Sequence, residues 1–328
     1  MATLKIALLI LSTSLQVAGE KCYGLSLEGG GTRGAYESGA LLALTEFLPA
    51  AETSYRIISG ISIGAINACS CAGFEVGDER NMALHVLGTW NGITSRKIIY
   101  SFWTGDIFWA LFFRPAAINN AAELKYIEER TGNEIKRNIS VAATNYNTSV
   151  YTNFNETLGP EYLPTACFAS GAYPGAFPPV YFQNDWWCDG AVTANLNAFI
   201  AVDRCREYGF EDKDIVMDLL YDEPWGGPDD LKVNNTRQLM NRILTVQKFF
   251  TTFWYISQTM NNFPEVDFRF MVMPTKPLPF PLSLDQKSIQ YEISLGYNDT
   301  VDLIKMRKGE RNDLRKMREN NFLLKLKN

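Results

Sequence analysis

The chain is poor in histidine: its 328 residues include only one, His85. A Ser-His-Asp site of the α/β-hydrolase type needs an acid and then a histidine downstream of its serine. His85 lies shortly after Ser62, the strongest candidate for a nucleophilic serine, and no histidine follows it. That triad cannot be assembled here, so a reactive Ser62 would need a base other than histidine. We expect His85 itself to be a structural residue.

The chain also lacks other functional signatures. No Cys-x-x-Cys pair occurs, which together with a single histidine argues against a structural zinc site, and there is no EF-hand pattern. The formal net charge of −5 argues against nucleic acid as a partner. Beyond the N-terminus no apolar run is long enough to span a bilayer, and no repeat or low-complexity linker divides the chain. We therefore expect one domain over residues 20–328.

The first 19 residues have the features of a secretory signal peptide. Lys5 precedes an apolar run at residues 6–15, and Val17-Ala18-Gly19 supplies small residues for cleavage. The apolar run is shorter than the roughly 20 residues that cross a bilayer, which favours a cleaved signal over a membrane anchor. The sequence therefore predicts a mature chain that begins at Glu20 and is secreted or enters the secretory-pathway lumen.

Disulfide bonds and carbohydrate are expected in that compartment. The six cysteines would meet an oxidising environment, but their spacing does not choose a pairing. Five Asn-x-Ser/Thr sequons are candidate glycosylation sites: Asn138, Asn147, Asn155, Asn234 and Asn298.

The order of predicted elements indicates an α/β fold. Short strands at residues 23–27 and 55–59 each lead directly into a helix, at 33–48 and 63–72. Such an order predicts a layered, parallel-rich sheet flanked by helices. Further strands are expected at 139–144, 149–154, 180–188, 215–220 and 268–273, and further helices at 163–171, 231–262 and 299–327. The part from about 231 to 328 is thus expected to be largely helical.

A glycine-rich segment, GGGTRG at residues 29–34, follows the first predicted strand. Consecutive glycines allow backbone N–H groups to converge on one point, and a following helix adds the positive end of its dipole, so the segment could bind an oxyanion. The candidate donors are Gly29, Gly30 and Gly31. Arg33 would either add positive charge or orient the loop through a carboxylate. The same letters fit a dinucleotide fingerprint, but the acid required at a strand end is missing, because only Glu46 lies in that region, inside a predicted helix.

Two further motifs supply a candidate nucleophile and base. Residues 60–64, GISIG, have the form of a nucleophile elbow, in which a tight turn exposes the serine, here Ser62, at a helix start. Asp189 ends a predicted strand and is followed by Gly190 and Ala191. An Asp-Gly pair is usually only a turn. Beside the other two motifs, however, Asp189 becomes a candidate for the base that accepts the proton of Ser62.

In this order and spacing, the three motifs resemble the GGGxRG, GxSxG and DG[AG] motifs of the patatin-like phospholipase family. Residues 169–180 and 189–195 also resemble the family's ASxAxPxxFPPV and DGxxxxN segments, so the resemblance covers about residues 23–199. It implies a Ser62–Asp189 catalytic dyad, no metal or cofactor, and Gly30 and Gly31 as the foremost oxyanion donors. Gly34, Gly60, Gly64, Gly190 and Ala191 complete the motifs. Glu28 is a departure, because relatives more often have Asp or Ser there; it could pair with Arg33.

The resemblance implies hydrolysis of fatty-acyl esters of phospholipids or related lipids through an acyl-Ser62 intermediate. The alternative is a lipid-binding or storage glycoprotein with little turnover. Aromatic clusters at residues 100–113 and 249–255 could form a lipid-facing rim, although core packing is the favoured interpretation. The basic segment 305–328 could lie on anionic lipid, although a solvated helix is favoured. The expected partner is an acyl lipid, and a peripheral lipid surface is a further candidate.

Overall fold

The computed structural model describes residues 20–103, 107–223 and 234–309. The predicted signal peptide at 1–19 lies outside the described residues. So do residues 231–233 and 310–327 of the two predicted C-terminal helices, and most of the basic segment.

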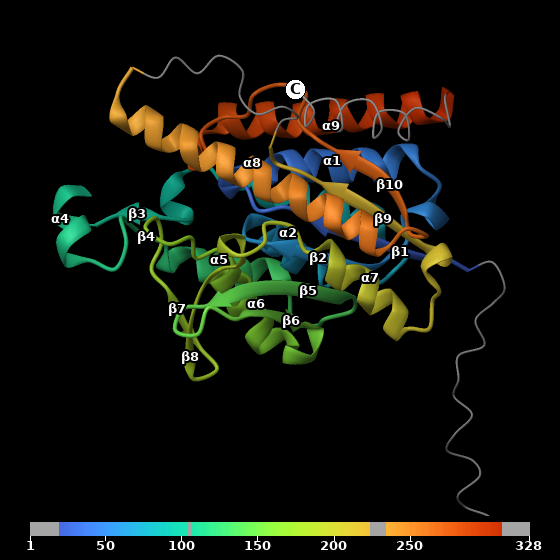
Figure 1. The fold of residues 1–328 in the computed structure, drawn as a ribbon, viewed down its shortest axis with the longest axis horizontal. Coiled ribbons are helices and arrows are strands. Elements are labelled where there is room, and N and C mark those ends of the chain that lie inside the picture. The colour runs from blue at the N-terminus through green and yellow to red at the C-terminus, as the bar shows by residue number, and fades with distance from the viewer. Residues whose placement is uncertain (1–19, 104–106, 224–233, 310–328) are drawn as a thin grey trace, which may run out of the picture.

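A mostly parallel sheet forms the centre of the molecule (Figure 1). Its five parallel strands are, in spatial order, β10 (Asp267–Val272), β9 (Ile215–Leu220), β1 (Cys22–Leu27), β2 (Tyr55–Ile61) and β5 (Asn138–Asn145). Three antiparallel strands follow at the β5 edge: β6 (Tyr151–Asn155), β7 (Val180–Phe182) and β8 (Asp185–Asp189). All six residues of β9 are buried, as expected of a parallel strand with helices on both faces.

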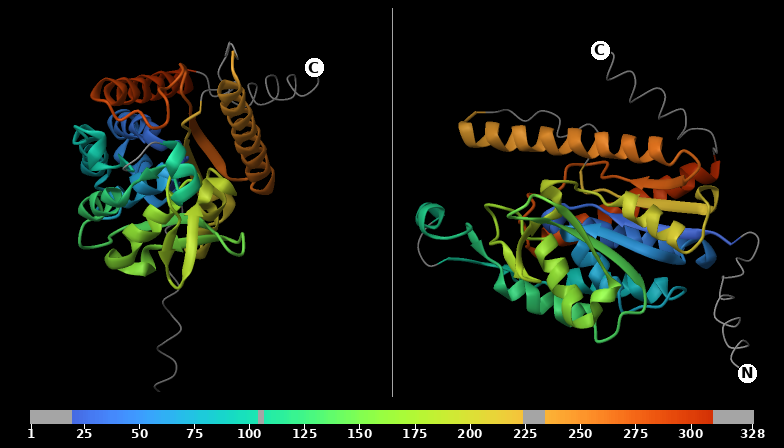
Figure 2. Two further views of the ribbon diagram at one scale, coloured as in Figure 1. Left: turned by 90° about the vertical axis from the view of Figure 1, so that its left-hand side faces the viewer. Right: turned by 60° about the horizontal axis from the view of Figure 1, so that its bottom comes forward.

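Successive residues of the parallel strands contribute to two different hydrophobic clusters. Ile58 packs into a large cluster with helices α1 (Gly34–Phe47), α2 (Ile63–Cys71), α3 (Glu79–Asn91), α5 (Ala121–Thr131), α6 (Gly159–Ser170) and α9 (Gln286–Gly309). Its neighbour Ile57 packs into a smaller cluster with α7 (Ala198–Glu207) and α8 (Thr236–Asn262). Because side chains alternate along a strand, the sheet separates two helical layers. Figure 2 shows α8 on one side of the sheet and α1 and α9 on the other.

The remaining elements are small. Strands β3 (Ser101–Phe102) and β4 (Ile118–Asn119) form a separate pair, and the short helix α4 (Ile107–Phe113) lies between them in sequence. None of the helices in the described ranges is long and apolar enough to cross a membrane.

The predicted α/β class is confirmed, although several individual elements differ from the prediction. Residues 180–188, predicted as one strand, form the β7–β8 hairpin, because Gln183 and Asn184 both adopt positive φ (49° and 62°) and turn the chain. Helices α3, α4, α5 and α7 were not predicted, and α9 begins at Gln286 rather than at Asp299.

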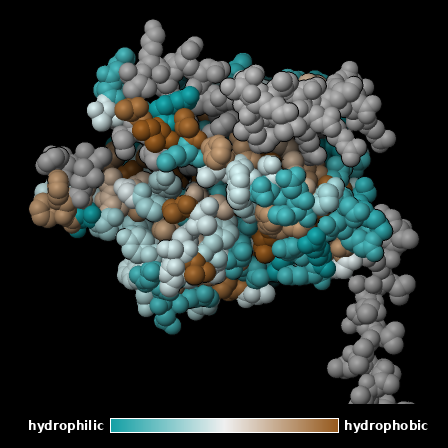
Figure 3. Space-filling view, viewed as in Figure 1, coloured by the Kyte–Doolittle hydropathy of each residue, from teal (hydrophilic) through white to brown (hydrophobic). Residues whose placement is uncertain are grey.

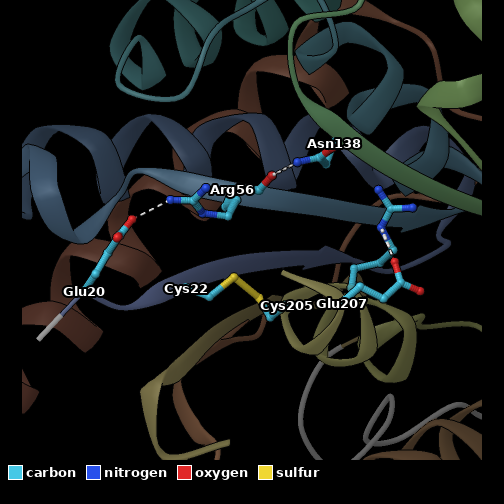
Figure 4. The surroundings of a disulfide bond; sticks show 7 residues. Glu20, Cys22, Arg56, Asn138, Cys205 and Glu207 are labelled. Carbon is cyan, nitrogen blue, oxygen red and sulfur yellow. Dashed lines mark hydrogen bonds and ion pairs between the residues drawn. A yellow bond between two sulfur atoms is a disulfide. The ribbon is translucent and has the colours of Figure 1, made fainter. Parts of the chain in front are cut away.

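One disulfide bond is present among the described residues. It joins Cys22, the first residue of β1, to Cys205 near the end of α7 (Figure 4). The other cysteines, Cys69, Cys71, Cys167 and Cys188, are buried free thiols. The bond therefore ties the start of the central strand to the layer that contains α7.

Replacement of Cys205 by alanine should destabilise the protein. The bond closes a loop that spans 183 positions of sequence, and removal of a native disulfide commonly costs about 2–5 kcal/mol. We expect a lower midpoint of denaturant unfolding for Cys205→Ala than for the wild type, and no further effect of a reducing agent on the variant. Titration of six rather than four thiols in the unreduced wild type would contradict the assignment.

Candidate active site

Ser62 lies on a sharp turn between β2 and α2. Strand β2 ends at Ile61 and α2 begins at Ile63, while Ser62 itself adopts φ 55° and ψ −121°. Positive φ is strained for a non-glycine residue and is typical of a nucleophile elbow. The flanking glycines permit close packing: a Cβ on Gly60 would lie 2.1 Å from the carbonyl oxygen of Gly64, and a Cβ on Gly64 2.4 Å from that of Leu27.

Strand β5 brings Asp189 to this turn. Its pairing with β2 ends where Ile61 meets Ala142, and its pairing with β8 begins at the next residue, where Ala143 meets Asp189. Since β6 pairs with β5 over residues 140–144 and a strand has two edges, β2 and β8 occupy the other edge in succession. Asp189 therefore lies just beyond the end of β2, next to Ser62.

The two side chains form a hydrogen bond. The Ser62 hydroxyl donates to Asp189 Oδ2 at 2.6 Å, while Asp189 Oδ1 accepts the Ala191 N–H at 2.8 Å. Asp189 is fully buried, whereas Ser62 retains 8% of its surface exposed. One carboxylate oxygen is thus fixed by the backbone and the other faces the hydroxyl, which is the geometry that a base requires.

Ser170, to which the sequence assigned no role, fixes the backbone of the turn. Its hydroxyl accepts the Ser62 N–H at 2.9 Å and donates to the carbonyl oxygen of Ala142 at 2.6 Å. The residue belongs to the segment that resembles the ASxAxPxxFPPV pattern, but that pattern does not by itself reveal the contact with Ser62. Ser170 therefore connects the turn to Ala142, the last residue of β5 that pairs with β2 before β8 takes over.

The glycine-rich loop lies beside the turn. A Cβ on Gly29 would lie 2.7 Å from the Cβ of Ser62. The Gly29 N–H donates to the Asn195 carbonyl at 3.1 Å, and the Asn195 amide donates to the Gly29 carbonyl at 2.8 Å. In the described part of the chain, the N–H groups of Gly30 and Gly31 donate to no other protein atom. Those two amides are therefore available to a ligand.

Both glycines are required by the surrounding structure. A Cβ on Gly30 would lie 2.2 Å from Asp222 Oδ2, and one on Gly31 would lie 2.3 Å from the Pro281 carbonyl. Gly31 also has a positive φ of 67°. Side chains at these positions would displace the loop.

Glu28 and Arg33 do not pair with each other, so that expectation is wrong. The Arg33 guanidinium forms an ion pair with Glu223 at 2.6 Å and donates to the Pro279 carbonyl. It orients the loop through a carboxylate, the second of the two expected roles.

Glu28 is instead fully buried and joins three segments. Its carboxylate accepts the Asn195 amide at 2.9 Å, the Asp222 N–H at 2.8 Å and the Thr252 hydroxyl of α8 at 3.0 Å. The contributions of Asp222, Glu223 and Thr252 were missed from sequence. The position of Asp222 and Glu223 just after β9 was the available signal, because polar residues at the carboxyl ends of parallel strands commonly serve a site.

Further buried carboxyl groups surround the loop. The pKa of Glu292 is raised to about 9, mainly by burial and also by the charge of Asp222, although the Arg33 guanidinium opposes this rise. Burial also raises the pKa of Glu37 well above its ordinary value, again with a contribution from Asp222. Glu292 therefore holds its proton at neutral pH. No cluster suited to a metal ion occurs among the residues that the structure describes.

Core packing is the wrong interpretation for much of the two aromatic clusters. In the first, Tyr100 is buried, but Phe102, Trp109, Phe112 and Phe113 are exposed. In the second, Phe250 and Trp254 are exposed.

The only histidine, His85, contacts the Arg130 carbonyl rather than Ser62 or Asp189.

A serine and a carboxylate that meet at the carboxyl end of a sheet, beside two available backbone amides, define a candidate serine-hydrolase site. The family model for patatin-like phospholipase matches residues 25–202, more than half of the chain. The chain therefore belongs to the patatin-like phospholipase family. Membership implies lipid acyl hydrolase activity.

Solved structures show weaker similarity. VipD from Legionella pneumophila matches with 15% identity and a TM-score of 0.42, over 88% of this chain and 67% of VipD. The type III effector protein ExoU matches with 13% identity and a TM-score of 0.33, over 88% of this chain and 54% of ExoU. No curated protein matches the chain.

The raised pKa of Glu292 predicts a pH-dependent stability. The folded protein keeps this proton up to about pH 9, whereas the unfolded chain releases it near 4.5, so stability falls as the pH rises between these values. Glu292→Gln should remove that fall and raise the melting temperature at pH 8 by a few degrees, with little change at pH 4. Thermal unfolding at both pH values tests this.

Asp302→Asn, an exposed carboxylate on the same helix, is the matched control and should change neither value. An equal effect of Glu292→Gln at both pH values would show that the carboxyl group does not titrate as described.

Proposed function

We propose that the chain hydrolyses fatty-acyl esters of phospholipids or related lipids, with Ser62 as nucleophile and Asp189 as its base. The observation that carries the proposal is the 2.6 Å hydrogen bond from the Ser62 hydroxyl to Asp189. It occurs in a chain whose family implies lipid acyl hydrolysis. The single histidine of the chain contacts the Arg130 carbonyl instead, so the carboxylate is the base that the serine can use.

In the first step, Ser62 Oγ attacks the ester carbonyl carbon while its proton passes to Asp189 Oδ2. A carboxylate can accept this proton when it is desolvated and close to the hydroxyl, and buried Asp189 meets both conditions. The tetrahedral intermediate collapses to an acyl-serine, and the departing alkoxide takes the proton back from Asp189. Water then attacks the acyl-serine with Asp189 again as base, and Ser62 recovers its proton when the fatty acid leaves.

The negative charge on the tetrahedral intermediate needs backbone donors. The N–H groups of Gly30 and Gly31 are the proposed donors, because both are available and the adjacent Gly29 N–H is bound to Asn195. The 3₁₀ turn Gly31–Arg33 and helix α1 follow at once, so their N-terminal ends add positive potential at the same place. Arg33 supports the loop through Glu223 rather than through direct contact with the intermediate.

The proposed site of action is outside the cell or in the lumen of the secretory pathway. The predicted signal peptide supports this, as does the disulfide bond between Cys22 and Cys205, since such bonds persist in oxidising compartments. Three of the proposed glycosylation sites, Asn147, Asn234 and Asn298, are exposed, whereas Asn138 and Asn155 are partly buried.

Loss of either member of the proposed dyad should abolish turnover. We expect Ser62→Ala and Asp189→Asn to lower fatty-acid release from mixed phospholipid vesicles by at least about 10³-fold, because the first lacks the nucleophile and the second cannot accept its proton. The assay is run on the purified mature chain without added calcium. Asp203→Asn, an exposed carboxylate on α7, is the matched control and should keep the wild-type rate.

A wild-type rate for Asp189→Asn would refute the assignment of the base. Absence of release from the wild type itself, with lipid binding intact, would favour the alternative of a lipid-binding or storage glycoprotein.

A further inference from the structure

Helix α8 carries an exposed apolar stripe along one side. The stripe consists of Leu239, Ile243, Val246, Phe250 and Trp254, each between 43% and 62% exposed. Their spacing of three or four residues brings all five side chains to one face of the helix. From Leu239 to Trp254 the stripe is about 22 Å long at the rise of an α-helix. Figure 3 shows apolar side chains gathered over the N-terminal half of α8.

The opposite face of α8 holds the helix against the domain. Thr252, Ile256 and Thr259 are buried, and Ile256 belongs to the hydrophobic cluster shared with α7 and the sheet. The Thr252 hydroxyl donates to Glu28, the residue directly before Gly29. The same helix therefore contacts the glycine-rich loop on its inner face and exposes the apolar stripe on its outer face.

The charge of α8 indicates what the stripe contacts. Its 27 residues include Arg237, Arg242 and Lys248 but no Asp or Glu, although the whole chain carries a net charge of −5. A helix with an apolar face, aromatic residues and only basic charges suits the surface of an anionic bilayer. A second copy docked through the same face would bring two such basic helices together, which disfavours a dimer through this stripe.

A second group of exposed aromatic side chains, on helix α4, supports contact between a lipid surface and this part of the molecule. Helix α4 exposes Trp109, Phe112 and Phe113, and the Arg114 guanidinium lies over the Trp109 ring. Helix α4 and the N-terminal end of α8 project from the same end of the molecule in Figures 1 and 2. Aromatic side chains beside a basic residue are favoured at the interface between water and lipid.

We propose that the outer stripe of α8 docks on the surface of an anionic lipid bilayer. Docking would bring the glycine-rich loop to about one helix diameter, roughly 10 Å, from the lipid. The benefit to catalysis rests on the proposed function, because an acyl lipid would then reach Ser62 from the surface to which the protein is bound. The docking itself does not depend on the proposed function, because it rests on the exposed stripe, the basic charge of α8 and the exposed aromatic side chains of α4.

The test is sedimentation of the full mature chain with vesicles of phosphatidylcholine alone or with about 30% phosphatidylserine. We expect binding to the anionic vesicles that weakens at high salt. The double variant Ile243→Ser, Phe250→Ser should bind at least about tenfold more weakly, because two half-exposed apolar side chains no longer enter the interface. Val76→Ser, Leu84→Ser is the control. It removes two other exposed apolar side chains, one just before α3 and one on it, each 43% exposed, and should bind normally.

A second readout separates docking from catalysis. Hydrolysis of a water-soluble short-chain ester needs no bilayer, so the stripe variant should keep the wild-type rate in this assay; that result also shows that it is folded. If the wild type hydrolyses no ester, folding is followed by thermal unfolding. If the wild type then binds vesicles and the folded stripe variant does not, docking is supported although the proposed hydrolysis is not.

Equal vesicle binding by the wild type and the stripe variant would overturn the proposal. So would light scattering that shows a wild-type dimer converted to a monomer by the same substitutions, because the stripe would then be a contact between copies. Trp254→Ser alone should also weaken vesicle binding. If neither this variant nor the double variant binds vesicles more weakly than the wild type, the stripe is not the docking surface.

Discussion

The candidate site depends on one feature of strand β5, the change of partner between Ala142 and Ala143. Up to Ala142 the strand pairs with β2, whose last residue precedes Ser62, and from Ala143 it pairs with β8, whose last residue is Asp189. Two segments separated by 127 residues in sequence thereby end side by side. Ser170 reinforces the junction by bonding both the Ser62 N–H and the Ala142 carbonyl. A serine and a carboxylate come into contact because two strands share one edge of a third.

The C-terminal part of the chain supports the glycine-rich loop. The Thr32 N–H donates to the Pro281 carbonyl, Arg33 pairs with Glu223, and Thr252 of α8 donates to Glu28. None of these partners belongs to the segment of about residues 23–199 that carries the motifs. The motif-bearing part thus supplies the candidate serine and aspartate, and later segments hold the glycine-rich loop beside them. The same arrangement lets one helix, α8, reach from the loop to the exposed stripe.

Sequence reasoning succeeded where short local patterns determine the structure. The strand and helix on each side of Gly29–Gly31 and of Ser62 were predicted within a few residues, because apolar runs and glycine turns are local signals. The serine, the aspartate and the glycines were named from the motifs alone. The fold class followed from the alternation of strands and helices.

Sequence reasoning failed where the outcome depends on contacts between distant segments. The pairing of Arg33 with Glu223 rather than Glu28 spans 190 residues, and no local pattern reports it. To predict the disulfide between Cys22 and Cys205, one would have to know how helix α7 packs against strand β1. The aromatic clusters were assigned to the core because composition does not reveal which side of a helix faces water; exposure of Phe112 and Phe250 required the assembled fold.

Covalent labelling shows whether Ser62 is the nucleophile. The mature chain is treated with a fluorophosphonate, which phosphonylates activated serines, and the modified peptide is identified by mass spectrometry. We expect one adduct per chain, on Ser62, that forms much more slowly in Asp189→Asn. An adduct on a different serine, or no adduct in a preparation that releases fatty acid, would contradict it.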